Sequence, residues 1–96
     1  MDKKLLQDYS WIIRGSQRLA VIKVMDKIMT PSQIQKEAKK INPNISLNNC
    51  SDVLRAMEEH GIVKCLNPKE KLGRLYELSK KGKEIQKELL ITSKDL

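Results

Sequence analysis

The sequence predicts an α+β fold that is mostly helical, and three observations lead to this prediction. Two short amphipathic patterns, at residues 30–40 and 46–61, are separated only by a short turn. A β-branched stretch at residues 62–68 follows the second pattern at once. A charged loop containing a glycine then leads to a second strand pattern at residues 74–79. The chain is therefore expected to form two linked helices and then a β-hairpin, because the spacing of its apolar residues changes from helical to extended.

Helix, turn, helix and a hairpin with a basic tip is the plan of a winged helix-turn-helix. The sequence thus predicts such a domain, with a two- or three-stranded β-wing. In this plan the second helix is shaped to enter a DNA major groove, and the hairpin reaches the neighbouring backbone. The 96 residues suffice for one modest core, so residues 1–96 are expected to form a single domain with its core at about residues 10–86.

The region before these two helices is predicted to contain one firm helix, over residues 16–27. Ser16 can cap it, and the apolar residues from Leu19 to Met29 follow an approximately helical spacing. Residues 1–9 are polar and suggest at most a helical turn. The stretch 9–15 is aromatic and β-branched, which fits either a strand or the end of a first helix.

The first helix of the pair has a clear start signal and a clear stop signal. Thr30 can cap it, and the proline that follows needs no N–H partner at the first helical position. Ile34 and Ala38 lie one turn apart, and Ile41 is expected to complete this apolar face. The Asn-Pro-Asn sequence that comes next ends the helix, since a residue before proline avoids the helical region.

The second helix of the pair, residues 46–60, is predicted to have two distinct faces. Ser46 caps its start, and Gly61 follows its last turn. Its apolar residues fall at positions i, i+3, i+4 and i+7, which is the spacing of a stripe that faces a core. These residues are Cys50, Val53, Leu54 and Met57.

The opposite face of this helix carries small polar side chains and one arginine. Asparagine pairs with adenine, arginine with guanine, and serine bonds phosphates or base edges. Every amphipathic helix has a polar face, so it is the capped helix before it and the basic hairpin after it that favour DNA. The residues predicted to face DNA are Ser46, Asn48, Asn49, Ser51, Asp52 and Arg55.

The hairpin is predicted to have a basic tip at residues 67–74. Ile62, Val63 and Leu66 make its first strand apolar, while Pro68 and Gly73 bracket the loop. Basic side chains exposed at such a tip contact phosphates or enter a minor groove. The residues expected to do so are Lys69, Lys71 and Arg74.

The positive charge of the chain is concentrated on this hairpin and on the start of the last helix. Of the net charge of +7, residues 61–83 carry seven Lys or Arg against two Glu, which gives +5. Residues 31–60 balance, with four basic and four acidic residues. A basic excess on one element indicates a polyanionic partner, although a solvated lysine-rich surface has the same composition.

The sequence shows no metal site and no catalytic constellation. Cys50 and Cys65 fall at apolar positions, and with His60 they lack any CxxC or HxxxH spacing. We expect two small buried thiols in a reducing compartment, with a redox switch as the alternative. His60 is expected to serve at the surface or as a helix cap, beside Glu58 and Glu59. Without a phosphate-binding loop or a paired acid, neither an enzyme nor a cofactor is predicted.

No segment of the sequence is expected to interact with a membrane. No apolar run approaches the roughly 20 residues that a membrane-spanning helix needs, and the first ten residues have no long apolar stretch of the kind found in a signal peptide. A soluble, cytoplasmic protein is therefore predicted.

Four stretches together resemble the small winged-helix transcription regulators common in archaea, which are related to the ArsR and MarR groups. They are RGSQRLAVIKVM, TPSQIQKEAKK, ISLNNCSDVLRAMEEHGIVKCLNP and GRLYELSKKGKEI, within residues 10–86. The resemblance implies that residues 46–60 are the recognition helix and residues 67–74 the wing tip. Asp52 departs from it, because relatives often carry a basic or neutral polar residue there, and Asp52 can pair with Arg55 or Lys23 instead. The metal ligands of metal-sensing relatives are absent as a set, so metal sensing is not implied.

The function predicted from these patterns is that of a sequence-specific regulator of transcription that binds double-stranded DNA as a homodimer. A single small module reads few base pairs, and two-fold symmetry doubles the contact. The alternative is a winged-helix module that binds protein within a larger assembly. The terminal apolar residues could form the dimer interface or pack on the domain's own core; they are Trp11, Ile12, Ile13, Ile85, Leu89, Leu90 and Ile91.

Overall fold

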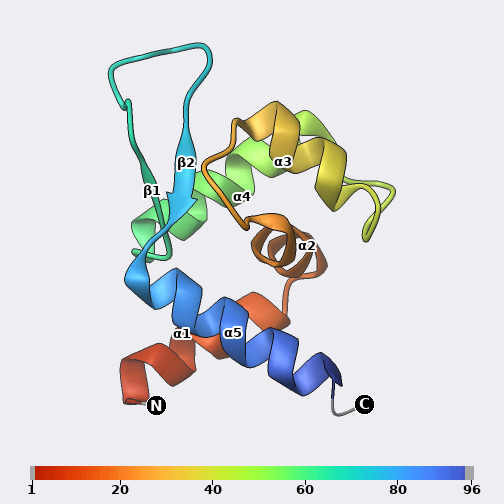
Figure 1. The fold of residues 1–96 in the computed structure, drawn as a ribbon, viewed down its shortest axis with the longest axis vertical. Coiled ribbons are helices and arrows are strands. Elements are labelled where there is room, and N and C mark those ends of the chain that lie inside the picture. Colours follow the sequence, from red (N-terminus) through yellow and green to blue (C-terminus); the bar gives the residue numbers. More distant parts are fainter. Residues whose placement is uncertain (1, 95–96) are drawn as a thin grey trace.

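The computed structural model describes residues 2–94, and the side chains of residues 2–91. Residues 2–94 form five helices and one two-stranded antiparallel sheet, which confirms the expected α+β, mostly helical class. The terminal helices lie together at one end of the molecule, and the hairpin projects from the other end (Figure 1). The elements are α1 (Lys3–Ile13), α2 (Ser16–Val24), α3 (Pro31–Ala38), α4 (Leu47–Glu59), β1 (Val63–Cys65), β2 (Tyr76–Leu78) and α5 (Lys80–Lys94).

The chain begins with a full helix where the sequence predicted at most one turn. The Asp2 carboxylate accepts a hydrogen bond of 2.8 Å from the Leu5 N–H, which caps α1. Ile12 is completely buried in the core. Of the two alternatives for residues 9–15, the end of a first helix is therefore correct. The helix thus includes residues 3–9, for which the sequence predicted no more than a turn. Asp8 is the one buried residue among residues 2–9, and it contacts Lys81 of the distant helix α5.

Helix α2 ends at Val24, three residues before the predicted end. The Gln86 side-chain amide, from α5, donates hydrogen bonds to the carbonyl oxygens of Ile22 and Met25, at 2.8 and 3.0 Å. These bonds satisfy carbonyls that the helix end leaves without partners. The chain then turns, and Met29 forms an isolated antiparallel bridge with Tyr76. The hairpin thus consists of two strands with a third segment attached at a single residue pair.

Helices α3 and α4 begin with the same local device. The Thr30 hydroxyl accepts from the Gln33 N–H at 3.2 Å, and the Gln33 side chain accepts from the Thr30 N–H at 2.9 Å. Ser46 and Asn49 form the same reciprocal pair at the start of α4, at 3.0 and 3.2 Å. The starts predicted at Thr30 and Ser46 are therefore confirmed.

One part of the predicted apolar face of α3 was wrong. The helix ends at Ala38, and the Ile41 side chain that was expected to complete the face is 49% exposed. Ile45, in the loop after the proline, is fully buried instead. Residues 39–41 form a turn instead of continuing the helix, so Ile41 leaves the apolar face and Ile45 fills the core.

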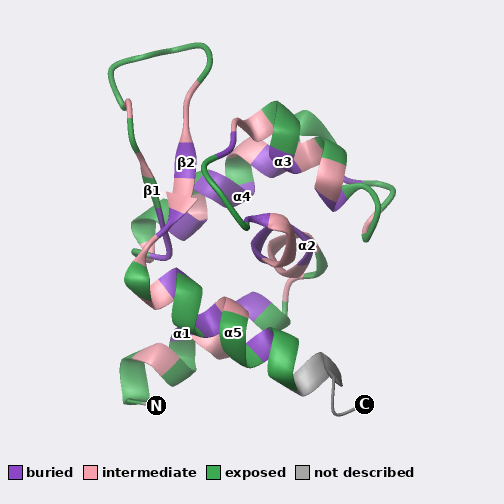
Figure 2. Cartoon of the chain, in the orientation of Figure 1, coloured by how far each residue is buried: buried purple, intermediate pink, exposed green. Residues whose placement is uncertain are grey.

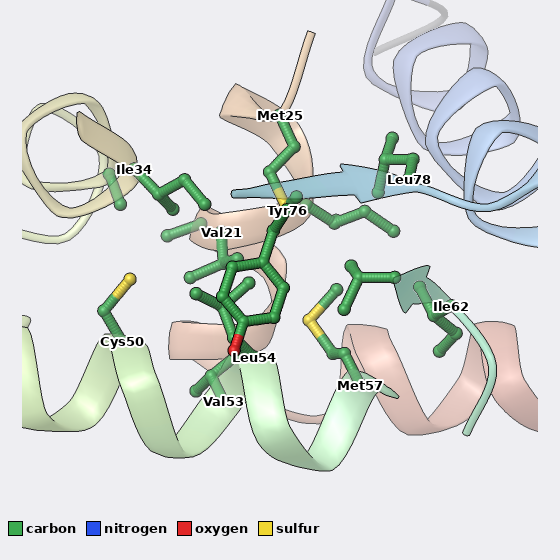
Figure 3. Close-up of a cluster of buried hydrophobic side chains, with 14 of the residues drawn as sticks. Val21, Met25, Ile34, Cys50, Val53, Leu54, Met57, Ile62, Tyr76 and Leu78 are labelled. Carbon is green, nitrogen blue, oxygen red and sulfur yellow. The ribbon is translucent and has the colours of Figure 1, made fainter. Parts of the chain in front are cut away.

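The core runs from Ile12 to Leu89 and takes side chains from every helix and both strands (Figure 2). The predicted stripe of α4 is confirmed, since all four of its residues are buried. Figure 3 shows Leu54 and Met57 directed from α4 toward Val21 of α2 and Tyr76 of β2. Because this stripe is anchored on one side, the opposite side of α4 must face solvent.

A close approach joins the hairpin to α5. A Cβ atom on Gly82 would lie 2.1 Å from the carbonyl oxygen of Ile62, so only glycine fits in this turn of α5. The Ser79 hydroxyl donates to the Gly61 carbonyl oxygen at 2.6 Å and accepts from the Gly82 N–H at 3.1 Å. The end of α4 and the start of α5 are thereby held together.

The hairpin strands are shorter than the sequence predicted, with three residues each. Val63 pairs with Leu78, and Cys65 pairs with Tyr76. Beyond them the Asn67 side chain joins the two arms, accepting from the Leu75 N–H at 2.7 Å and donating to the Gly73 carbonyl oxygen at 3.1 Å. The hairpin tip (residues 67–74) is thus held by side-chain bonds as well as by the strand ladder.

Within residues 2–94, no helix has both the length and the apolar character that crossing a membrane requires.

Candidate nucleic-acid interface

The exposed face of α4 carries four of the nine residues predicted to contact DNA. Asn48, Asp52 and Arg55 are exposed, and Ser51 is half-buried beside them. Their side chains lie opposite the buried stripe, as the helical spacing predicts. This polar face is therefore held in a fixed orientation by the packing of the other face.

Asp52 and Arg55 form an ion pair on this face. The Arg55 Nη1 atom lies 3.7 Å from an Asp52 carboxylate oxygen, and both side chains are 71% exposed. Arg55 was one of the two partners expected for Asp52. Such an exposed pair contributes about 0–1 kcal/mol, so Arg55 can exchange Asp52 for another acceptor at little cost.

Ser46 and Asn49 are already engaged in local bonds. The Ser46 hydroxyl accepts from the Asn49 N–H, and the side-chain Oδ1 of Asn49 accepts from the Ser46 N–H. Ser46 is exposed, whereas Asn49 is half-buried on the flank of α4. Both residues therefore form the cap of α4, whereas Asn48, Ser51 and Arg55 take no part in it.

Two of the three predicted basic residues of the hairpin tip are exposed. Lys69 and Lys71 lie in the exposed loop that Figure 2 shows projecting from the molecule. Leu72 lies beside them and is 89% exposed. The tip thus presents two ammonium groups and one apolar side chain to solvent.

The sequence predicted that Arg74 would extend into solvent, but in the structure its side chain bonds back onto the loop. Its Nε donates a hydrogen bond of 2.7 Å to the carbonyl oxygen of Glu70, so the guanidinium folds back across the loop. Its interaction with the Tyr76 hydroxyl raises the pKa of Arg74. Arg74 therefore helps to shape the tip, and its predicted contact with a polyanion stays a prediction beside those of Lys69 and Lys71.

A groove of about 690 Å³ separates the hairpin tip from α4. Ser51, Arg55 and Glu58 line it from α4, and Lys71 and Arg74 line it from the tip. Leu47, Leu72 and Tyr76 add apolar surface to the same groove. Polar groups of α4 and cationic groups of the tip thus face a common space.

A buried cluster that the sequence analysis missed connects the two ends of the chain to α4. Asp8 of α1 is only 6% exposed. Its carboxylate accepts from the Lys81 ammonium at 2.8 Å and lies 3.0 Å from Nδ1 of His60. Burial raises the pKa of Asp8, but the hydrogen bonds from Lys81 and His60 outweigh it and leave the pKa below its ordinary value.

His60 has a larger role than the cap that was expected. It does terminate α4, and its ring also stacks on Trp11, with centroids 3.8 Å apart and planes 9° apart. The Arg18 guanidinium covers Trp11, with its carbon 4.4 Å from the ring centroid. The sequence held one signal for the buried position of Asp8. Asp8 lies four residues before the apolar Ile12, so the two side chains share one face of α1.

The two cysteines differ in burial. Cys50 is fully buried in the core, as expected, and burial raises the pKa of its thiol to about 11. Cys65 of β1 is only half-buried, which departs from the expectation of a buried thiol. Among the described residues, no group of three or more His, Cys, Asp or Glu side chains could hold a metal ion.

The terminal helices hold less spare apolar surface than the sequence suggested. Ile12, Ile85 and Leu89 belong to the core, so they are not available to a partner. Trp11 is half-buried against the core. The exposed apolar residues of these helices are Leu6, Ile13, Leu90 and Ile91.

Comparison of the chain with family models, with curated proteins and with solved structures finds no match. The geometry of α4 and the hairpin is thus the basis for assigning a function.

Proposed function

We propose that this protein is a winged helix-turn-helix regulator of transcription that binds specific double-stranded DNA sequences. Helix α4 enters the major groove, and the hairpin acts as the wing on the neighbouring backbone. The observation that carries this proposal is the arrangement of α4 beside the hairpin: Asn48, Ser51 and Arg55 lie outward on an anchored helix, next to a projecting tip with two exposed lysines. The proposal agrees with the resemblance to small archaeal regulators.

The distribution of charge on α4 favours entry by its N-terminal half. Glu58 and Glu59 lie in its last turn, where they would repel phosphates, whereas the first turn contains no acidic residue. Asparagine and serine there present donors and acceptors to base edges. Asp52 can accept from a cytosine amino group, and its release of Arg55 frees a guanidinium for guanine.

The terminal helices support a homodimer as part of this proposal. Leu6 and Ile13 are seven residues apart on α1 and so share one face, and Leu90 and Ile91 are exposed on the adjacent α5. Burying these residues against a second copy would remove apolar surface from water. A two-fold pair would also place two copies of α4 about 34 Å apart, the spacing of successive major grooves.

The decisive experiment is the selection of bound fragments from genomic DNA with the purified protein, followed by titration of the enriched duplex at several salt concentrations. Enrichment of one sequence is expected, with an affinity that falls steeply with salt, because each phosphate contact releases counterions. Equal recovery of all fragments, or an affinity independent of salt, would contradict the proposal.

A protein-binding module is the second candidate, and the exposure of Leu72 favours it. An apolar side chain at the end of a loop, facing the groove that Leu47 and Tyr76 also line, could contact an apolar side chain of a partner. The same titration separates the two functions, since this candidate predicts no salt-dependent binding to duplex DNA.

A further inference from the structure

Helix α4 is a ridge with a groove on each side. The first groove lies toward the hairpin tip, as described above. A second groove, of about 440 Å³, lies on the other flank, between α4 and the turn that joins α1 to α2. Asn49, Asp52 and Ala56 line it from α4, while Arg14 and Gln17 line it from the turn.

The positions along α4 account for this shape. Successive residues turn by about 100° around a helix. Asn48, Asp52 and Arg55 therefore form the crest of the ridge, opposite the buried stripe. Ser51 lies on the side of α4 that faces the hairpin, and Ala56 lies on the side that faces the α1–α2 turn. Each residue lines the groove on its own side.

The α1–α2 turn is held in place against the end of α4. The Arg18 Nε atom donates to the Trp11 carbonyl oxygen at 2.8 Å, and its guanidinium covers the Trp11 ring. Trp11 in turn stacks on His60, which is the C-cap residue of α4. The position of the turn relative to α4 is therefore set by a stack of three side chains.

Arg14 is the cation that this turn presents. Its side chain is exposed, and its Nε makes only a long hydrogen bond of 3.3 Å to the Ser10 carbonyl oxygen. Arg18, in contrast, is committed to Trp11. Arg14 thus stands across the second groove from α4 much as Lys71 stands across the first groove.

A helix in the major groove has a phosphate chain on each side, because the two strands form the two walls of the groove. Resting on the function proposed above, we propose that the α1–α2 turn is a second backbone-binding element, with Arg14 as its phosphate-binding side chain. The hairpin tip then holds one strand of the duplex through Lys71, and the turn holds the other strand through Arg14.

The test compares Arg14→Gln, Lys71→Gln and the control Lys87→Gln, an equal charge change at an exposed position of α5. Each of the first two variants is expected to weaken binding to all duplexes alike. Each should also reduce the dependence of log affinity on log salt by about one unit. The control is expected to keep the salt dependence of the parent, and Arg14→Lys to restore most of what Arg14→Gln loses. Circular dichroism checks that every variant is folded.

Ethylation interference then identifies the strand. The parent is expected to show sensitive phosphates on both strands, with Arg14→Gln losing those on one strand and Lys71→Gln those on the other. The inference is overturned if Arg14→Gln behaves like the control, or if it loses the same phosphates as Lys71→Gln. In either case the proposed function stands, whereas a parent that binds no duplex would overturn both.

Discussion

In the proposed DNA-binding function, the ion pair between Asp52 and Arg55 limits how readily Arg55 reaches a base. The pair is weak because its atoms are 3.7 Å apart and both side chains are exposed. Arg55 therefore loses little free energy when it leaves Asp52 for another acceptor. A guanine offers Arg55 a bidentate arrangement that a carboxylate at 3.7 Å does not. Arg55 is therefore the side chain on which specificity should depend most.

Replacing Arg55 with alanine should reduce affinity for the selected sequence by about 1–3 kcal/mol, because a bidentate contact with guanine is lost. Affinity for unrelated duplexes should change much less. Asp52→Asn serves as the matched variant and should strengthen binding to all duplexes, since a negative charge facing phosphates is removed. Fluorescence anisotropy with both kinds of duplex measures these changes, and an Arg55→Ala variant with the affinity of the parent would remove this residue from the site.

Asp8 presents a different case, because its partners make it a determinant of stability. Lys81 and His60 hold its pKa below the ordinary value, so its contribution to stability is present above that value and is lost as the pH falls through the lowered pKa. Asp8→Asn should lower the free energy of unfolding at pH 7 by about 1.5–3 kcal/mol, the range for hydrogen bonds to charged groups.

Urea unfolding of the Asp8→Asn variant at pH 7 and at pH 3 measures this effect. The difference between the variant and the parent should shrink at the lower pH. The control is Glu37→Gln, which alters an exposed ion pair with Lys40 and should change stability little. A difference of equal size at both pH values would mean that the charge of Asp8 is not what stabilises the fold.

At the scale of the elements, the starts of α3 and α4 follow from local chemistry, whereas the end of α2 depends on a distant residue. The capping boxes of α3 and α4 join residues three positions apart, so Thr30 and Ser46 could be identified from the sequence. The end of α2 could not, because Gln86 reaches it from 61 and 64 positions away. The buried stripe of α4 was predictable since it depends only on the helical period.

The start of α5 offers a test of this distinction. Alanine normally stabilises a helix by about 1 kcal/mol relative to glycine. At Gly82, however, a Cβ atom would collide with the Ile62 carbonyl oxygen. We therefore expect Gly82→Ala to lower the thermal unfolding midpoint and Lys83→Ala, at the next, exposed position, to leave it nearly unchanged. A midpoint raised by Gly82→Ala would show that α5 does not lie this close to β1.

At the scale of the whole molecule, the proposed homodimer would double the surface that contacts DNA. The surface proposed for a second copy consists of the exposed apolar residues of α1 and α5, whereas Ile12, Ile85 and Leu89 belong to the core. Equilibrium sedimentation at micromolar concentration should give a mass near twice 11.1 kDa.

Ile13→Glu should shift this mass toward that of the monomer, because a charge at the interface would be buried without a partner. Ile41→Glu is the matched control, since the two isoleucines are similarly exposed, at 46% and 49%. A parent that sediments as a monomer yet binds its sequence specifically would contradict the dimer and leave the DNA-binding role of α4 intact.

The sequence by itself determined those features that depend on neighbours within one or two helical turns. These are the caps of α3 and α4, the two faces of α4, and the hairpin with its basic tip. The cap predicted at Ser16 was wrong, because Gly15 precedes α2 without a side-chain bond. Only the tertiary structure decided that Asp8 meets residues 52 and 73 positions away, and that Arg74 folds back into the tip. It also decided that α4 lies between two grooves. The physical reason is that a periodic pattern specifies which side of a helix is buried, whereas the packing of distant segments specifies what lies beside it.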